Sequence, residues 1–199
     1  MEHSTLSGGT VRRLWPSDRS AFLDHLLRLD PDSRHDRVGG AVSEACITAY
    51  AARCFGAEDV IHGYFNDGVL RGAGELRPVG ADAGGTRAAE AAFSVETEHR
   101  RSGVGTELMA RVVRAARNRR VRTLFMVCLA HNRAMQALSR KFAAELRFEF
   151  DSVSGRLIGR APTPLSLWRE AADDAAGFAA AVLDLQRRAF WPRPAAPRV

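Results

Sequence analysis

Apolar positions along the chain follow two spacings, one typical of strands and one typical of helices. Residues 10–15 predict a first strand, and an apolar stripe at helical spacing after Asp18 predicts a helix. Residues 30–33, Asp-Pro-Asp-Ser, are expected to break this helix, and residues 43–52 predict a second one. The N-terminal part is therefore expected to hold one strand and two helices.

Two apolar runs in the middle of the chain predict a β-hairpin. Residues 60–65 and 69–76 flank Asn66-Asp67-Gly68, and these residue types tolerate the positive φ angles of a tight turn. A loose, glycine-rich loop leads to a third run at residues 88–95. We therefore expect a hairpin followed by a third strand.

The second half of the chain alternates helices and strands. A helix with one apolar face is expected to begin near Gly103 and to end at Arg119-Arg120. Thr123–Leu129 is apolar at every position after the first, which predicts a strand buried on both faces. Asn132 can cap a further helix. Two last strands are expected at residues 145–150 and 156–160, around a turn at residues 151–155, and the order of elements predicts a mixed α/β sheet.

Beyond residue 162 the pattern changes to one long helical repeat of apolar positions. We expect a first domain at residues 1–162, a helical extension at residues 163–190 and a flexible, proline-rich tail at residues 191–199. The apolar stripe of the extension has two interpretations: it covers the sheet of its own domain, or it forms the seam of a homodimer. The stripe consists of Leu165, Trp168, Ala172, Ala175, Phe178, Val182, Leu185 and Ala189.

Length and composition restrict the class of protein. With 199 residues, 46% of them apolar, the chain is long enough for one globular domain. Its apolar runs are far shorter than the ~20 residues of a membrane span, so no membrane partner is expected. The N-terminus lacks a secretory leader, and the three cysteines form no C-x-x-C pair. These features predict a cytoplasmic protein without a disulfide framework or a metal site.

Positive charge is concentrated in one part of the chain. The formal net charge is +6, and all but one of the 29 basic residues are arginines. Residues 100–122 hold eight of these arginines and a single acid, Glu107. Such a segment suits an anionic partner, and the question is which anion.

The turn at the start of that segment carries residues suited to phosphate. A strand is followed by Arg-Arg-Ser-Gly-Val-Gly at residues 100–105 and then by an amphipathic helix. The first turn of a helix exposes unpaired N–H groups, and the two glycines allow a ligand to approach the main chain. The residues alone therefore predict a pyrophosphate site. A P-loop lysine and the third glycine of a dinucleotide fingerprint are both missing.

Two motifs resemble those of the GNAT N-acetyltransferase superfamily. Arg100, Gly103 and Gly105 match its coenzyme A loop, Gln/Arg-x-x-Gly-x-Gly/Ala, and residues 132–138, Asn-Arg-Ala-Met-Gln-Ala-Leu, resemble its second motif. The resemblance spans about residues 10–162. It implies an α/β fold with a mixed, mostly antiparallel sheet flanked by helices. The parallel fourth and fifth strands, at residues 88–95 and Thr123–Leu129, are expected to splay apart at its centre.

The resemblance also implies acetyl-coenzyme A as co-substrate and no metal. The pantetheine arm is expected in the wedge between the splayed strands, paired with the main chain near Phe93, Ser94 and Val95, with Asn132 beside it. The pyrophosphate is expected on the basic turn and the first residues of the helix. The residues expected there are Arg100, Arg101, Ser102, Gly103, Val104, Gly105 and Thr106.

The resemblance implies two catalytic positions. Glu90 resembles a position where several family members carry a glutamate base, and a carboxylate paired with an arginine is the alternative. The tyrosine that usually protonates the leaving thiolate is replaced by Ser139. Either Ser139 or water would then protonate the sulfur.

The implied function is transfer of an acetyl group from acetyl-coenzyme A, by direct attack of an amine of a small molecule, a protein or a peptide. Because Ser139 replaces the tyrosine, a coenzyme A-binding regulatory module with little or no catalysis is an alternative. Nucleic-acid binding through the arginines is a third interpretation. It lacks the interleaved aromatic residues and the recognition helix that such binding uses.

Overall fold

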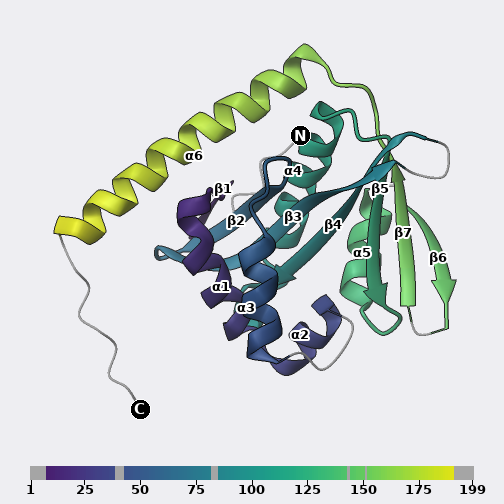
Figure 1. Ribbon diagram of the computed structural model, residues 1–199, viewed down its shortest axis with the longest axis horizontal. Coiled ribbons are helices and arrows are strands. Elements are labelled where there is room, and N and C mark those ends of the chain that lie inside the picture. The colour runs from purple at the N-terminus through teal and green to yellow at the C-terminus, as the bar shows by residue number, and fades with distance from the viewer. Residues whose placement is uncertain (1–7, 39–42, 82–84, 143, 151, 191–199) are drawn as a thin grey trace.

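Seven strands form one sheet in a computed structural model that describes residues 8–38, 43–81, 85–142, 144–150 and 152–190. The strands are β1 (Gly9–Arg13), β2 (Val60–Asn66), β3 (Val69–Ala81), β4 (Arg87–Val95), β5 (Thr123–Leu129), β6 (Glu145–Glu149) and β7 (Ser152–Ile158). Their order in the sheet is β1-β2-β3-β4-β5-β7-β6 (Figure 1). All neighbours are antiparallel except β4 and β5, which are parallel. The predicted mixed, mostly antiparallel α/β fold is confirmed.

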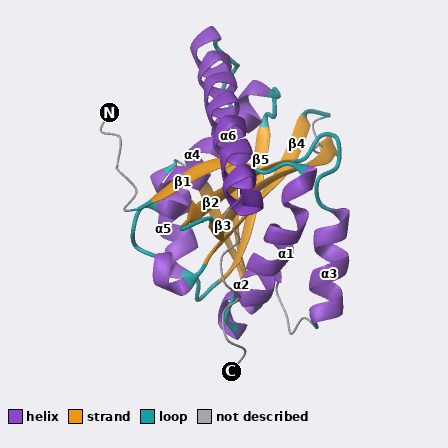
Figure 2. Cartoon of the chain, turned by 90° about the vertical axis from the view of Figure 1, so that its left-hand side faces the viewer, coloured by secondary structure: helices purple, strands orange, loops and turns teal. Residues whose placement is uncertain are grey.

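Helices cover both faces of the sheet. They are α1 (Arg19–Arg28), α2 (Pro31–Val38), α3 (Glu44–Arg53), α4 (Val104–Asn118), α5 (Arg133–Lys141) and α6 (Pro164–Phe190). Figure 2 shows α1 and α3 on one side of the sheet and α4 and α5 on the other. One apolar core joins α1 and α3 to β2 and β3, and a second joins α4 and α5 to β4, β5 and β7. Within the described ranges, no helix has the length and apolar character that a bilayer crossing requires.

Local signals in the sequence produced the expected turn between β2 and β3 and the expected cap at Asn132, together with a cap at Ser43 that was not predicted. Asp67 and Gly68 have φ angles of 50° and 72°, as the tight turn between β2 and β3 requires. Ser43 caps α3, because its hydroxyl accepts a hydrogen bond from the amide of Cys46 at 3.3 Å. The Asn132 side chain caps α5 by accepting from the amide of Met135 at 2.9 Å.

The expected break after the first helix is confirmed, but helix α2 was not predicted, and the expected start of the last strand was wrong. Residues 30–33 end α1 but also start α2, because Pro31 is compatible with a first helical position and the Asp30 carboxylate accepts from the Ser33 amide at 2.8 Å. Strand β7 begins at Ser152 rather than at residue 156. Gly155 lies within this strand opposite Leu146, so it does not mark a turn.

Strands β4 and β5 pair over only three residues each, at the start of both strands. Ala88, Ala89 and Glu90 of β4 pair with Thr123, Leu124 and Phe125 of β5. Beyond these pairs β4 remains bonded to β3, and β5 remains bonded to β7. The two central strands therefore separate into a wedge, as expected. The expectation that β5 is buried on both faces was wrong, since the Val127 side chain is 59% exposed at this wedge.

Helix α6 contacts the body through polar side chains. Glu170, which is buried, binds Arg119 at 2.6 Å and also accepts from Asn118. Asp173 binds both Arg111 and Arg114 of α4. Asp174 binds Arg13 of β1 at 3.0 Å. Arg111, Arg114 and Arg119 of the basic segment are therefore part of the surface on which α6 docks.

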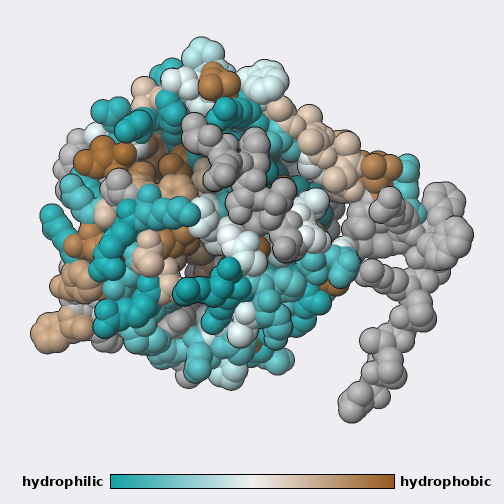
Figure 3. Space-filling view, turned by 180° about the vertical axis from the view of Figure 1, so that it is seen from behind, coloured by the Kyte–Doolittle hydropathy of each residue, from teal (hydrophilic) through white to brown (hydrophobic). Residues whose placement is uncertain are grey.

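The apolar stripe of α6 faces outward. Six of its side chains are described, and all six are exposed. Figure 1 shows the helix running past the β1 edge of the sheet, and Figure 3 shows pale and brown surface along this projecting part. The interpretation that the stripe covers the sheet of its own domain was wrong, because these six side chains are exposed, Phe178 meeting the body through an edge-on contact with Trp15, while the described buried positions of α6 are Ser166, Glu170 and Gly177. The flexible tail expected at residues 191–199 lies outside the described residues.

We predict that Glu170→Gln loosens α6. The substitution keeps the size of the side chain but removes the charge that binds Arg119, and it should lower the free energy of unfolding by about 1–3 kcal/mol. Chemical denaturation measures this change. Asp24→Asn, at an exposed position of α1, is the control and should leave stability unchanged. Equal stability of Glu170→Gln and the wild type would contradict the docking role.

A buried histidine of β2 faces the same arginines. His62 is 1% exposed, and neither of its ring nitrogens has a hydrogen-bond partner among the described residues. Burial and the charges of Arg111, Arg114, Arg13 and Arg119 lower the pKa of His62 to about 3. The ring is therefore neutral in the folded protein at neutral pH.

We predict that His62 makes the fold sensitive to mild acid. Between pH 6.5 and pH 3 the unfolded chain binds a proton at His62 that the folded chain does not. Stability should therefore fall as pH decreases, by up to about 1.4 kcal/mol per pH unit. In His62→Leu the slope between pH 6.5 and 5 should become shallower, while His35→Gln, at an exposed position of α2, should keep it. An unchanged slope in His62→Leu would exclude this origin.

Candidate functional site

A cavity of about 820 Å³ occupies the wedge between β4 and β5. Met135 and Leu138 of α5 line it on one side of the sheet, and Ser33 of α2 lines it on the other. The cavity therefore passes through the sheet, and this is only possible because β4 and β5 stop pairing after Glu90 and Phe125. Main-chain groups of two unpaired strand edges can bind an extended ligand in the manner of an added strand.

One end of the cavity lies at the N-terminus of α4. Gly103 is the N-cap and has a φ of 88°, and Arg101 before it has a φ of 60°. No side chain caps the helix at Gly103, and the first amides of any helix lack intrahelical acceptors. Lys141 of α5 also lines this region, with its Nζ 3.5 Å from the Thr106 hydroxyl. Free amides, the helix dipole and cationic side chains together suit a phosphate group.

The structure brings most of the predicted cofactor residues into this one cavity. The predicted residues that line it are Glu90, Phe93, Ser94, Val95, Arg100, Arg101, Gly103, Gly105, Thr106 and Asn132.

Three predicted residues are placed elsewhere. The Ser102 hydroxyl donates to the His99 carbonyl at 2.6 Å, and the Val104 side chain is buried against Tyr64 and Leu108. Ser139 is 2% exposed, and its hydroxyl lies 4.0 Å from the sulfur of Met126. Its position gives no support to a role as the acid that protonates a ligand in the cavity.

Arg100 is bound to neighbouring protein groups rather than unpaired at the entrance of the cavity. Its guanidinium donates to the Val95 carbonyl at 3.1 Å and to the Ser33 hydroxyl, and it lies 3.7 Å from the Asp30 carboxylate. The Ser33 hydroxyl and amide, with Thr97 and Arg100, keep the pKa of Asp30 well below its usual range. The arginine therefore ties α2 to the end of β4.

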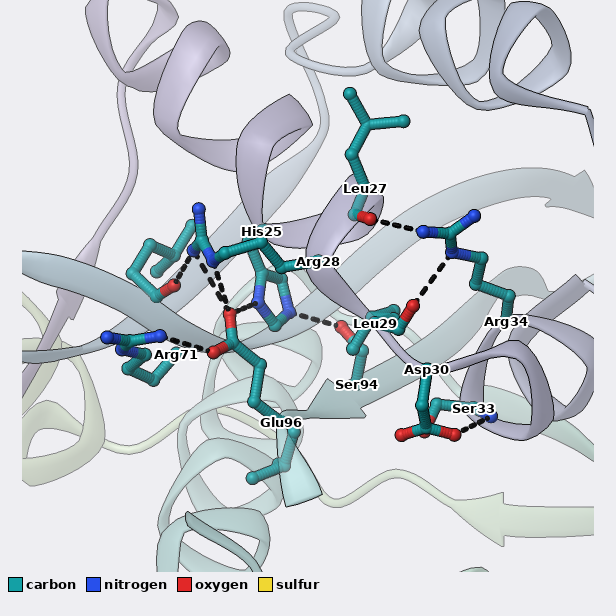
Figure 4. Close-up of polar contacts among 12 residues, drawn as sticks. His25, Leu27, Arg28, Leu29, Asp30, Ser33, Arg34, Arg71, Ser94 and Glu96 are labelled. Carbon is teal, nitrogen blue, oxygen red and sulfur yellow. Dashed lines mark hydrogen bonds and ion pairs between the residues drawn. The ribbon is translucent and has the colours of Figure 1, made fainter. Parts of the chain in front are cut away.

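The sequence analysis missed two groups of functional candidates. Lys141, the single lysine, follows Ala134, Ala137 and Leu138 on one face of α5, so the helical period after Asn132 could have indicated it. The second group is a buried polar network at the end of β4 (Figure 4). It joins α1 to residues far along the chain, and no local sequence signal points to it.

Glu96, just after β4, is the centre of this network. One of its oxygens accepts from His25 of α1 at 3.1 Å and from Arg28 at 3.1 Å, and the other accepts from Arg71 at 2.7 Å. Burial alone would raise the pKa of Glu96, but these donors and the charge of Arg28 lower it to about 2. Burial lowers the pKa of His25 by more than Glu96 raises it. The carboxylate is therefore charged and the imidazole neutral near pH 7.

Comparisons with known proteins agree with this geometry. The model of the Acetyltransferase (GNAT) family matches residues 20–144. A comparison with curated proteins gave no significant sequence match.

Three similar solved structures illustrate the agreement in fold. The GNAT domain of S. lividans PAT has a TM-score of 0.63 and 20% identity, and the match covers 75% of this chain and 90% of that one. A ribosomal-protein-alanine N-acetyltransferase from Brucella melitensis has a TM-score of 0.59 and 20% identity, with 75% and 99% covered. A phosphinothricin acetyltransferase from Sinorhizobium meliloti, in complex with AcCoA, has a TM-score of 0.58 and 17% identity, with 78% and 94% covered.

We predict that Gly105→Ala blocks the anion end of the cavity without unfolding the protein. A Cβ at Gly105 would lie 3.7 Å from Leu138, which is an ordinary contact, so the melting temperature should stay within about 2 °C of wild type. The methyl group would stand where a phosphate approaches the main chain, so calorimetric affinity for acetyl-coenzyme A should fall about tenfold or more. Unchanged affinity in a folded variant would place the phosphate elsewhere.

Proposed function

The chain belongs to the acetyltransferase (GNAT) family, and from this premise we propose that it moves the acetyl group of acetyl-coenzyme A to the amine of a small molecule, a protein or a peptide. The observation that carries the proposal is the wedge, which leads from the free N-terminus of α4 between two unpaired strand edges. Neighbours of the same fold with acetyl-coenzyme A bound support this choice of ligand. Residues 1–162 would form the catalytic domain and residues 163–190 an extension, in a protein of the cytoplasm.

Each part of the cofactor has a matching part of the site. The pyrophosphate would bind the amides of residues 103–106, with Arg101 and Lys141 supplying positive charge at the surface. The pantetheine arm would extend the sheet by pairing with the free edge of β4 near Phe93, Ser94 and Val95. Asn132 would shape the opposite wall, where its side chain is already engaged as the cap of α5.

The reaction would be direct attack of the amine nitrogen on the thioester carbonyl. The ammonium form of an amine, with a pKa near ~10, must lose its proton first. Glu90 is exposed, lines the cavity and forms no ion pair with the described residues, so the arginine-paired alternative lacks support. Glu90 would therefore take this first proton, directly or through water, before the amine enters the wedge.

An assay of free thiol release across amines and peptide N-termini tests the proposal. We expect acetyl-coenzyme A-dependent thiol release with at least one amine class, and Glu90→Gln should lower kcat by about 10²-fold or more. Glu98→Gln, exposed and outside the cavity, is the matched control and should keep the wild-type rate. Binding of acetyl-coenzyme A without turnover on the whole panel would favour the regulatory module, and no heat of binding at millimolar ligand would exclude both.

A further inference from the structure

A serine of the cavity wall is hydrogen-bonded to a buried histidine. Ser94 lies on β4 and lines the wedge, and its Oγ is 2.9 Å from Nε2 of His25. His25 comes from α1 and is 0% exposed, with its Nδ1 3.1 Å from the Glu96 carboxylate. Figure 4 shows the imidazole between Ser94 and Glu96, with each ring nitrogen directed at one of them. A hydroxyl, an imidazole and a carboxylate thus stand in line, and the serine that carries the hydroxyl is a lining residue of the cavity with 8% of its surface exposed.

The partners of the ring decide which nitrogen carries the proton. Glu96 also accepts from Arg28 and Arg71, so it is ionised and can only accept. Nδ1 of His25 must therefore be the N–H donor. Because burial keeps the ring neutral, Nε2 carries the lone pair and accepts the hydrogen bond from the Ser94 hydroxyl. A base is thus placed directly behind the hydroxyl.

The position of Ser94 along β4 relates this hydroxyl to the reaction. Ser94 pairs with Ala73 of β3 on one side. On its other side it has no strand partner, because the pairing of β4 with β5 ends at Glu90. Ser94 and Glu90 lie on the same face of β4. Ser94 is four residues further along the strand, a separation of roughly 13 Å. Glu90 is therefore too remote to exchange a proton with groups held beside Ser94, and Ser139 is buried outside the cavity.

We propose that Ser94 is a catalytic residue that carries protons between the reacting atoms and His25, with His25 and Glu96 acting through it as positioning residues. This inference rests on the proposed acetyl transfer and concerns the same site. It assigns to the Ser94–His25 pair the proton transfers of the chemical step, including the protonation of the sulfur for which Ser139 was the candidate.

The step balances without any further reactant. The amine nitrogen bonds to the thioester carbon, and its surplus proton passes to Oγ of Ser94 while the Ser94 proton passes to Nε2 of His25. The carbon–sulfur bond then breaks and leaves its electron pair on sulfur. The His25 proton returns to Oγ as the Ser94 proton moves to the sulfur. The products are the N-acetyl amine and the coenzyme A thiol, and both residues are restored.

The surroundings of His25 suit a group that takes up a proton and releases it again, because its pKa is lowered. Burial is the largest cause that lowers the pKa of His25, and the charge of Arg28 lowers it further, whereas Glu96 and Glu75 raise it by less. The buried ring therefore holds the proton weakly. A weakly held proton is readily passed on to a thiolate, and this completes the reaction.

The first test compares two substitutions of Ser94. Ser94→Ala removes the hydroxyl and should lower kcat by about 10²-fold or more, while KM for acetyl-coenzyme A stays within about twofold. Ser94→Thr keeps a hydroxyl and should recover much of the lost rate. Ser17→Ala, at an exposed position remote from the cavity, should retain the wild-type kcat.

The second test separates proton transfer from packing. His25→Gln keeps a polar atom near Ser94 but cannot take up a proton, so it should lose rate about as Ser94→Ala does. The double variant Ser94→Ala/His25→Gln should be no slower than Ser94→Ala alone, because both substitutions remove the same step. If His25 were only structural, the losses would multiply. Melting curves and calorimetric binding of acetyl-coenzyme A establish that each variant is folded and loaded.

The outcomes distinguish this inference from the proposed function. Wild-type activity together with full activity in Ser94→Ala would overturn the relay and leave the acetyltransferase intact. Multiplicative losses in the double variant would also overturn it. A folded wild type that binds acetyl-coenzyme A but acetylates no amine would overturn the proposed function, and the relay with it. If His25→Gln does not fold, the Ser94→Ala and Ser94→Thr pair decides by kcat alone.

Discussion

The structure depends on the early loss of pairing between β4 and β5. A sheet with every edge bonded would leave no space for a ligand at its centre, and two parallel strands that never met would not hold the two halves together. Three residue pairs, from Ala88 to Glu90 of β4, connect β4 to β5. Beyond them β4 stays paired with β3, and β5 stays paired with β7. The exposed apolar side chain of Val127 and the cavity through the sheet both follow from this separation.

Helix α4 divides the basic segment between two tasks. Its first turn has no side-chain cap and points its amides at the cavity, as suits an anionic ligand. Further along, Arg111, Arg114 and Arg119 are neutralised by acids of α6. The concentration of arginine therefore reflects an internal interface as well as a ligand site. Planar guanidinium groups suit the internal interface, since one carboxylate can bind two of them at once.

The network around Glu96 connects the cavity wall to α1. Removing charges from water is costly, so a buried carboxylate among arginines and a histidine is weak evidence for stability alone. In this chain the network has a direct consequence for the cavity, because it sets the tautomer of His25 and the direction of the Ser94 hydroxyl. Arg100 performs a comparable task on the α2 side by joining Ser33 to the Val95 carbonyl.

The sequence by itself determined the features that depend on neighbouring residues. These are the strand and helix periods, the Asn66-Asp67-Gly68 turn, the caps at Ser43 and Asn132, and the glycine turn before α4. Only the tertiary structure decided that the α6 stripe faces outward, that Ser139 is buried outside the cavity, and that His25 lies between Ser94 and Glu96. The reason is physical: turns and caps are formed by bonds within a few residues. The direction of the Ser94 hydroxyl depends on a partner 69 residues away, and that of the α6 stripe depends on partners 51 to 161 residues away, which only packing brings together.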